Sequence, residues 1–331
     1  NLSSRLTFLM LQLLAAALLV CACQPLTMDP AHGVERTSAL EITSVEPYGQ
    51  FNGIDYLRYV GRLVDEANGG VPFEIVAPAD PNRSNGRLLV EPYHYAEGAG
   101  ARNNFLTPDF LFDRGFPHAA ICWQPPLPDF AEGHPCGGFE GEAEDALQIL
   151  SDFVVALRQG DAADMVGEID YVYSIGFSNS AEPLQRLLLE PSGQGLFDLS
   201  ILITTGWPLP IEPFAPLPEE MPATLVPDEN NGHVLLLQSE ADLIWANGAL
   251  LRDDGSNPNY RSYEVAGAQH IQGWPFPDAG LEFLPVIRGL FIAGDRWVSA
   301  GQAPPESLFI EEAPVGTIDP VYGLPTGIAP E

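Results

Sequence analysis

The sequence predicts an α/β protein with a mostly parallel sheet that is covered by helices on both faces. Two observations predict it: strand-like and helix-like segments alternate over residues 39–310, and neither an internal repeat nor a clear linker interrupts them. Apolar strands that alternate with helices are typical of parallel sheets buried on both sides. The composition agrees, because 46% of the residues are hydrophobic and 18% are charged, as in globular rather than disordered proteins.

Short β-prone apolar runs, bounded by turn residues, predict the strands. In chain order the predicted strands are residues 40–45, 56–64, 71–77, 87–91, 119–123, 169–175, 200–204, 234–238 and 260–265. Apolar residues three and four positions apart predict an amphipathic helix within residues 139–158. Further helices are predicted at residues 107–114, 180–190, 241–252 and 281–298.

Residues 207–230 hold seven prolines, too many for regular structure. We interpret this segment as an insertion above the sheet that serves as a cap or lid. The alternative is an ordered surface loop without a function. Residues 39–331 are predicted to form one domain.

The N-terminal residues 1–22 have the features of a secretory signal peptide. Arg5 precedes an apolar run that is too short for a comfortable membrane span, and small residues precede Cys23. This end also resembles the lipobox of bacterial lipoproteins, which predicts a lipid on Cys23 and membrane attachment. The alternatives are a plain secreted protein or an uncleaved anchor helix. Residues 23–38 are polar and irregular, as in a tether.

Charge and cysteine content restrict the partners and the compartment. The net charge is −31, and arginine supplies all 14 basic residues. Nucleic acid is therefore not expected as a partner, and anionic lipid surfaces are poor partners, because like charges repel. After cleavage before Cys23, the pair Cys122 and Cys136 remains. In an oxidising compartment this pair is predicted to form a disulfide, with two buried thiols as the alternative.

The stretch YVYSIGFSNSAEP, residues 171–183, places a serine between a predicted strand and a predicted helix. A strand–turn–helix elbow holds a serine in a strained backbone conformation and projects its hydroxyl into a cleft. Small residues two positions before and after let strand and helix approach closely, and Gly176 and Ser180 occupy these positions around Ser178. The alternative is an ordinary turn with a hydroxyl cap.

A serine nucleophile needs a base and an acid to orient the base, in the chain order serine, acid, histidine. Glu240 and Asp242 follow the predicted strand 234–238, and His270 follows the strand 260–265. Because parallel sheets place their sites at the carboxyl ends of strands, these side chains are expected to meet. Asp242 is favoured over Glu240 as the acid. The other histidines considered are predicted to be surface or structural residues: His32, His118, His134 and His233.

The same chemistry needs hydrogen-bond donors for the oxyanion that develops on the carbonyl oxygen. The backbone N–H of Asn179, directly after the serine, is one candidate. The loop after the strand 87–91 supplies a second from Tyr93 or His94, since Pro92 has no N–H. His94 contacting substrate and a purely structural loop are the alternatives.

The sequence resembles an uncharacterised bacterial branch of the α/β-hydrolase-domain proteins over roughly residues 56–307. The segments VPFEIVAPADPNRSNGRLLVEPYHY, GFSNSA, QSEAD, YEVAGAQH and RGLFIAGDRWVSAGQAPPES resemble that branch's motifs in the same order. Two positions depart from the pattern: Ser180 stands for a glycine, and His94 for an asparagine. The resemblance implies an α/β-hydrolase fold and a serine hydrolase that uses neither metal nor cofactor.

Together these features predict an exported esterase that acts on a small-molecule or polymeric carboxylic ester through an acyl-enzyme. A catalytically silent scaffold that binds a ligand or partner at the cell surface is one alternative. An acyltransferase or amidase with the same triad is the other. A metal hydrolase is not expected, because the sequence has no H-E-x-x-H or similar ligand spacing, and phosphate-loop motifs are absent too.

Overall fold

The computed structural model describes residues 38–65, 70–94, 106, 108–126, 128–139, 145–205, 226–245, 251–268, 270 and 284–310. These residues belong to one compact unit, Ser38–Glu331. The predicted signal peptide, Cys23 and the tether up to residue 37 lie outside the described residues, as do residues 207–225 of the predicted cap 207–230. No helix in the described part is long and apolar enough to cross a membrane.

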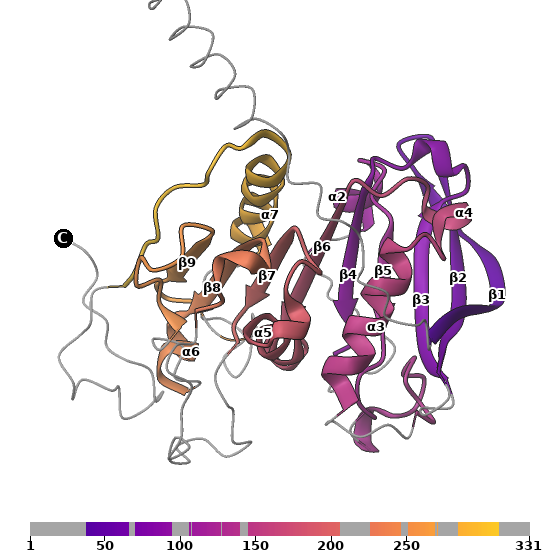
Figure 1. Cartoon of the computed structure of the whole chain (residues 1–331), viewed down its shortest axis with the longest axis horizontal. Coiled ribbons are helices and arrows are strands. Elements are labelled where there is room, and N and C mark those ends of the chain that lie inside the picture. Colours follow the sequence, from indigo (N-terminus) through magenta and orange to yellow (C-terminus); the bar gives the residue numbers. More distant parts are fainter. Residues whose placement is uncertain are drawn as a thin grey trace, which may run out of the picture. The chain divides into compact units, whose positions relative to one another are not determined.

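All nine predicted strands are present, and in the described residues they form a single sheet (Figure 1). The strands are β1 (Ser38–Phe51), β2 (Ile54–Asp65), β3 (Val71–Pro78), β4 (Arg87–Pro92), β5 (His118–Ile121), β6 (Tyr171–Phe177), β7 (Leu199–Ile203), β8 (His233–Ser239) and β9 (Tyr260–Val265). Their order across the sheet is β1-β2-β3-β5-β4-β6-β7-β8-β9. The first strand begins at Ser38, one residue before the predicted domain boundary.

The sheet is mostly parallel, as predicted. The pairs β4–β5, β4–β6, β6–β7, β7–β8 and β8–β9 are parallel. The pairs β1–β2, β2–β3 and β3–β5 are antiparallel, and they add three strands to one side of the parallel part. The carboxyl ends of β4, β6, β8 and β9 therefore lie along one edge, which is where the predicted site residues follow in the sequence.

Helices are spread over the two faces of the sheet. The α-helices are α2 (Pro108–Phe112), α3 (Ala146–Arg158), α4 (Ala163–Val166), α5 (Ala181–Leu189), α6 (Glu240–Trp245) and α7 (Leu284–Ala300). The 3₁₀-helices are η1 (Pro81–Arg83), η2 (Pro128–Phe130), η4 (Ser178–Ser180), η5 (Pro191–Gly193) and η6 (Glu229–Asn231). The helix predicted within residues 139–158 is α3, which begins at Ala146.

Two buried hydrophobic clusters, one on each face, hold these layers together. One cluster joins α3, α4 and α5 to the sheet, and the other joins α2 and α7 to the opposite face. Strand residues alternate between them: Leu88 and Val90 belong to the first cluster and Leu89 to the second. This is the period-2 alternation of a strand buried on both faces.

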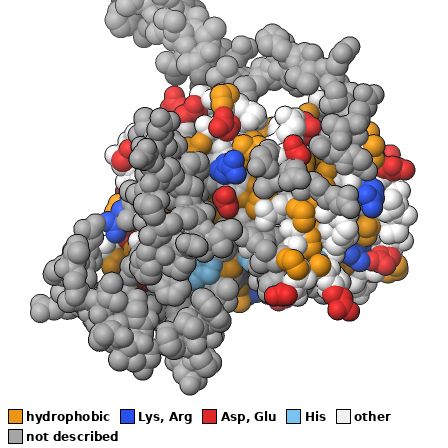
Figure 2. Space-filling model, turned by 90° about the horizontal axis from the view of Figure 1, so that it is seen from below, with side chains coloured by type: hydrophobic (Ala, Val, Ile, Leu, Met, Phe, Trp, Pro, Cys, Tyr) orange, Lys and Arg blue, Asp and Glu red, His pale blue; other side chains and the backbone are white. Residues whose placement is uncertain are grey.

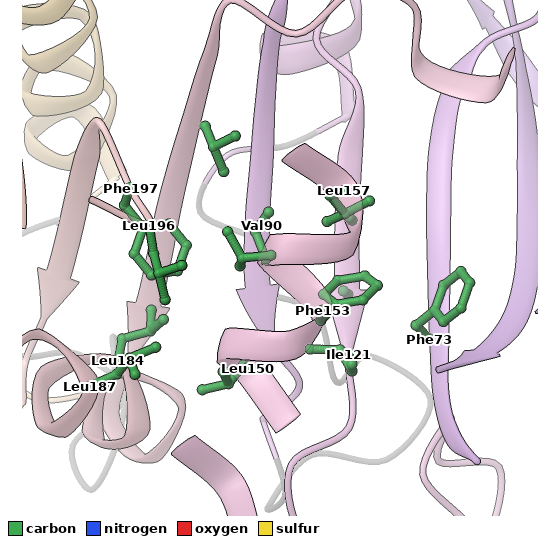
Figure 3. Packing of buried hydrophobic residues seen from close by; sticks show 14 of the residues in the cluster. Phe73, Val90, Ile121, Leu150, Phe153, Leu157, Leu184, Leu187, Leu196 and Phe197 are labelled. Atoms are coloured by element: carbon green, nitrogen blue, oxygen red, sulfur yellow. The ribbon is translucent and has the colours of Figure 1, made fainter. Parts of the chain in front are cut away.

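The packing of α3 shows why its apolar residues recur at helical spacing. Leu150, Phe153 and Leu157 lie on one side of the helix and point toward the sheet (Figure 3). The ring of Phe153 meets that of Phe73 on β3, with centroids 5.3 Å apart. Burying an apolar side chain of this size contributes roughly 1.5–3 kcal/mol, so this face fixes the helix on the sheet.

A disulfide joins Cys122, directly after β5, to Cys136. Both residues are buried, at 0% and 1% exposure. Their positions in the chain are 14 residues apart, so the bond closes a short loop at the same edge of the sheet as the predicted site.

We expect the double variant Cys122→Ala/Cys136→Ala to lose about 3 kcal/mol of unfolding free energy, because closing a loop of this length restricts the unfolded chain. Urea denaturation of the wild-type and double-variant proteins measures the difference. Wild-type protein treated with a thiol reductant serves as the control and should shift in the same direction. Equal unfolding midpoints for all three samples would contradict a stabilising disulfide.

Candidate active site

Ser178 lies where β6 ends, and its backbone is strained. Its φ is +52°, in the left-handed region that residues other than glycine rarely occupy. The chain turns there into η4 and then into α5, which is the predicted order of strand, turn and helix. Strain of this kind needs surrounding structure to maintain it, and it often occurs at functional sites.

Gly176 and Ser180 build the turn around Ser178. A Cβ on Gly176 would lie 2.5 Å from the Cα of Ala181, so only glycine allows the strand and the helix to approach this closely. Ser180, which replaces the glycine usual in similar proteins, holds the turn with its hydroxyl. Its Oγ accepts a hydrogen bond from the N–H of Phe177 at 2.9 Å and donates one to the Phe177 carbonyl oxygen at 2.9 Å.

The structure brings Ser178, His270 and Asp242 together from three different segments. The Ser178 Oγ lies 2.8 Å from the His270 Nε2, and the His270 Nδ1 lies 2.6 Å from the Asp242 Oδ1. Asp242 belongs to α6, which directly follows β8, and His270 follows β9. Strands β4 and β6 end at the lower edge of the sheet in Figure 1. Figure 2 shows the molecule from this side, where histidine side chains reach the surface beside hydrophobic ones.

These contacts fix the roles that the imidazole nitrogens can take. A carboxylate only accepts hydrogen bonds, so the proton of neutral His270 lies on Nδ1 and is donated to Asp242. The lone pair on Nε2 then faces the hydroxyl of Ser178. The Asp242 side chain is 4% exposed and that of His270 is 26% exposed, so the acid is buried while the base borders solvent. The arrangement can remove the proton from the serine hydroxyl.

Glu240, the alternative acid, is directed elsewhere. Its Oε2 accepts a hydrogen bond from the backbone N–H of Gly267 at 2.6 Å, in the turn that leads from β9 to His270. Glu240 therefore holds the loop that carries the histidine, and Asp242 contacts the imidazole. The reason is local: α6 begins at Glu240, and residues two apart on a helix do not share a face.

Ser239 is a further residue at this site that the sequence analysis did not identify. Its Oγ donates a hydrogen bond to the Asp242 Oδ2 and accepts one from the Asp242 N–H at 3.1 Å. It is fully buried at the last position of β8. The signal that could have revealed it is its place three residues before the acid, the spacing of a helix N-cap.

We expect Ser239→Ala to lower kcat about 10-fold with little change in KM, since hydrogen bonds to charged groups contribute roughly 1.5–3 kcal/mol and this one orients the acid. Steady-state ester hydrolysis measures the effect. Ser174→Ala is the matched control, because this buried serine bonds to Ser200 inside the sheet at 2.8 Å and is remote from the relay. Equal activity for the two variants would show that Ser239 does not orient Asp242.

The loop after β4 lies beside Asn179, the residue that follows the serine. The N–H of Tyr93 donates to the carbonyl oxygen of Ile121 at 2.9 Å and so continues the sheet. This excludes Tyr93, one of the two predicted alternatives, as the oxyanion donor of the loop. His94 therefore remains as the candidate donor of this loop. Its carbonyl oxygen accepts a hydrogen bond from His134, and the Tyr93 carbonyl oxygen accepts one from Trp123. The sequence analysis did not connect either of these donors with the site.

The His94 side chain is buried beside the relay. Its ring stacks on that of Phe177 with centroids 5.9 Å apart, and its Nδ1 lies 3.4 Å from the Asn179 Nδ2. Burial, and then the charges that His270 and His134 can carry, lower the pKa of His94 to about 4. His94 is therefore neutral above about pH 4, and it does not oppose a positive charge on His270 at neutral pH.

Comparison with known proteins gives distant matches among solved structures. Among solved structures, an esterase of Pyrococcus furiosus is 13% identical with a TM-score of 0.47, covering 80% of this chain and 98% of its own. A cold-adapted esterase from an Arctic intertidal metagenomic library is 12% identical with a TM-score of 0.42, covering 75% and 99%. Likenesses this distant carry no conclusion about the reaction. A sequence search of curated proteins gave no match.

The family assignment comes from the sequence profile of the alpha/beta hydrolase domain family, which matches residues 138–322. This range is more than half of the 331-residue chain and contains Ser178, Asp242 and His270. The nine-stranded, mostly parallel sheet with helices on both faces is the fold that the family predicts. The chain therefore belongs to the alpha/beta hydrolase domain family and has the α/β-hydrolase fold.

Proposed function

We propose that this protein is a serine hydrolase that cleaves carboxylic esters through a covalent acyl-enzyme on Ser178. One observation carries the proposal: the strained Ser178 places its Oγ 2.8 Å from the His270 Nε2, while Asp242 holds the opposite nitrogen at 2.6 Å. A hydroxyl is a weak nucleophile until a base removes its proton, and this geometry supplies the base and its orienting acid.

The acylation step follows from these positions. His270 removes the proton from Ser178, whose Oγ forms a bond to the ester carbonyl carbon. The negative charge that develops on the carbonyl oxygen is stabilised by the backbone N–H groups of Asn179 and His94. Asp242 stabilises the positive imidazolium. His270 then gives its proton to the leaving alcohol as the carbon–oxygen bond of the ester breaks.

Deacylation repeats the sequence with water. His270 removes a proton from a water molecule, whose oxygen attacks the acyl carbon. The tetrahedral intermediate collapses, the proton returns to the Ser178 Oγ, and the carboxylic acid leaves. The donors that stabilise the first oxyanion also stabilise the second, because the acyl oxygen keeps its place.

A panel of p-nitrophenyl esters of increasing acyl length tests the proposal. We expect turnover of at least the short esters, with a burst of nitrophenol where deacylation is slower than acylation. Adding a primary alcohol distinguishes hydrolysis from acyl transfer, since a transferase would give the new ester as its main product. Intact, folded protein that turns over no ester in the panel would contradict an esterase and favour a silent scaffold.

We further propose that the protein is exported, with cleavage before Cys23 and a lipid on that residue. The disulfide between Cys122 and Cys136 supports the export proposal, since such bonds persist mainly in oxidising compartments. The intact mass of the mature protein recovered from cell membranes tests both parts. A mature chain that still contains residues 1–22, without added lipid mass, would contradict them.

A further inference from the structure

Two successive carbonyl groups of the loop after β4 are held by buried side chains. The Trp123 Nε1 donates a hydrogen bond to the Tyr93 carbonyl oxygen at 2.8 Å. The His134 Nε2 lies 3.0 Å from the carbonyl oxygen of His94. All four residues are buried, with exposures between 2% and 7%. These hydrogen bonds are therefore shielded from competing water.

The direction of the His134 hydrogen bond follows from its other nitrogen. The backbone N–H of Cys136 donates to the His134 Nδ1 at 2.9 Å. An imidazole nitrogen that accepts a hydrogen bond carries no proton, so the proton of neutral His134 lies on Nε2. His134 is thus fixed as a donor to the His94 carbonyl. Its ring also contacts that of Tyr93 edge-on, with centroids 6.2 Å apart.

Both donors belong to the segment that the disulfide closes. Trp123 directly follows Cys122, and His134 precedes Cys136 by two residues. The bond between the two cysteines ties the ends of this segment together next to the loop after β4. We refer to Trp123 and His134, with this disulfide, as the carbonyl clamp.

We propose that Trp123 and His134 are positioning residues for the reaction, which aim the N–H of His94 at the oxyanion. The inference rests on the proposed function. Trp123 and His134 would act through the His94 peptide and would not contact the substrate themselves. A trans peptide is planar, so the N–H of His94 points opposite to the Tyr93 carbonyl that Trp123 holds. His134 holds the next peptide plane. With both planes fixed, the backbone torsions of His94 cannot drift.

Such a clamp acts on the transition state more than on substrate binding. An oxyanion donor is effective when it already points at the position where charge develops, with no reorganisation during the reaction. Loss of a clamp bond lets the His94 peptide rotate while leaving the relay of Ser178, His270 and Asp242 in place. We therefore expect a lower kcat with nearly unchanged KM, as for any interaction that is made in the transition state alone.

Three variants test the clamp. Trp123→Phe keeps a ring and removes only the donor, and His134→Leu removes the imidazole donor. We expect each variant to lower kcat about 10- to 100-fold and to change KM less than about 3-fold. This loss of kcat does not exceed the loss caused by removing an oxyanion donor altogether. His134→Gln retains an N–H donor of similar reach and is expected to recover most of the lost kcat.

His233→Leu is the matched control, because this half-buried histidine at the start of β8 contacts Trp297 and is remote from the loop. It should keep the wild-type kcat. Thermal unfolding of each variant identifies losses that come from misfolding, and the pH midpoint of kcat should stay that of the wild type. Folded Trp123→Phe and His134→Leu proteins with wild-type kcat would overturn the proposal, as would a rise in KM alone.

A second readout separates this inference from the proposed function. A fluorophosphonate transfers its phosphonyl group to the Ser178 Oγ with loss of fluoride, and the phosphonyl oxygen uses the same donors as an ester oxygen. We expect Trp123→Phe and His134→Leu to be phosphonylated about 10-fold more slowly than the wild type. If the wild type turns over no ester but is phosphonylated at Ser178, the ester assignment fails while the clamp is still tested. Equal phosphonylation rates in all variants would refute the clamp alone.

Discussion

Replacing Ser178 with alanine is expected to lower kcat for ester hydrolysis by about 10⁵- to 10⁶-fold, the scale of losing a serine nucleophile. The hydroxyl is the only group in the relay that can form the acyl bond, and its neighbours cannot replace it. KM should change little, since the rest of the substrate contacts persist. A continuous assay with the best ester of the panel, at high enzyme concentration, measures the residual rate.

Ser200→Ala is the control for this variant, because it removes a hydroxyl that is fully buried in β7 and accepts a hydrogen bond from Ser174 within the sheet. It should retain wild-type kcat. Ser178→Ala protein must also unfold at close to the wild-type temperature for the comparison to hold. Alanine keeps the Cβ of serine, so the backbone strain at φ +52° is the same in both proteins and gives no reason for destabilisation. Activity within 100-fold of wild type would place the nucleophile elsewhere.

Exchanging Asp242 for asparagine is expected to lower kcat by about 10⁴-fold, because the amide cannot stabilise the imidazolium and favours the wrong tautomer of His270. Glu240→Gln is expected to lower kcat no more than about 10-fold, since a neutral amide oxygen can still accept the N–H of Gly267. The pair compares two carboxylates that lie two residues apart, each with a small, nearly isosteric change. Both variants should have wild-type secondary structure by circular dichroism.

The ratio between these two effects is the decisive quantity. Asp242 contacts the imidazole at 2.6 Å, and Glu240 accepts a hydrogen bond from the backbone N–H of Gly267. A larger loss in Glu240→Gln than in Asp242→Asn would contradict these roles and indicate that α6 turns differently when substrate is bound.

The parts of the fold that the sequence predicted are those with a local signal. Apolar runs such as Val71–Pro78 and His233–Ser239 predict strands because nearly all of their residues are buried within the sheet. The strand–turn–helix elbow around Ser178 also has a local signal, because the small residues Gly176 and Ser180 indicate that strand and helix approach closely there. The antiparallel pairing of β1, β2 and β3 was not predicted, since strand order depends on contacts between distant segments.

The site shows the same division. Ser178, Asp242 and His270 could be proposed because each follows a strand, and parallel strands end at one edge. The choice between Asp242 and Glu240 depended on how α6 begins, which the sequence leaves open. The choice between Tyr93 and His94 depended on a sheet hydrogen bond to Ile121. The hydrogen bonds of Trp123 and His134 join segments that lie 30 and 40 residues apart in the chain. These features depend on tertiary contacts, which leave no pattern in the local sequence.

The most direct test of the central claim, that Ser178 is activated by His270, is to locate a fluorophosphonate adduct by peptide mass spectrometry. The account predicts one adduct per chain, on the peptide that contains Ser178. It also predicts that His270→Ala slows adduct formation by about 10³-fold or more, since the base is then missing. An adduct on another residue, or labelling of Ser178 at the wild-type rate without His270, would contradict it.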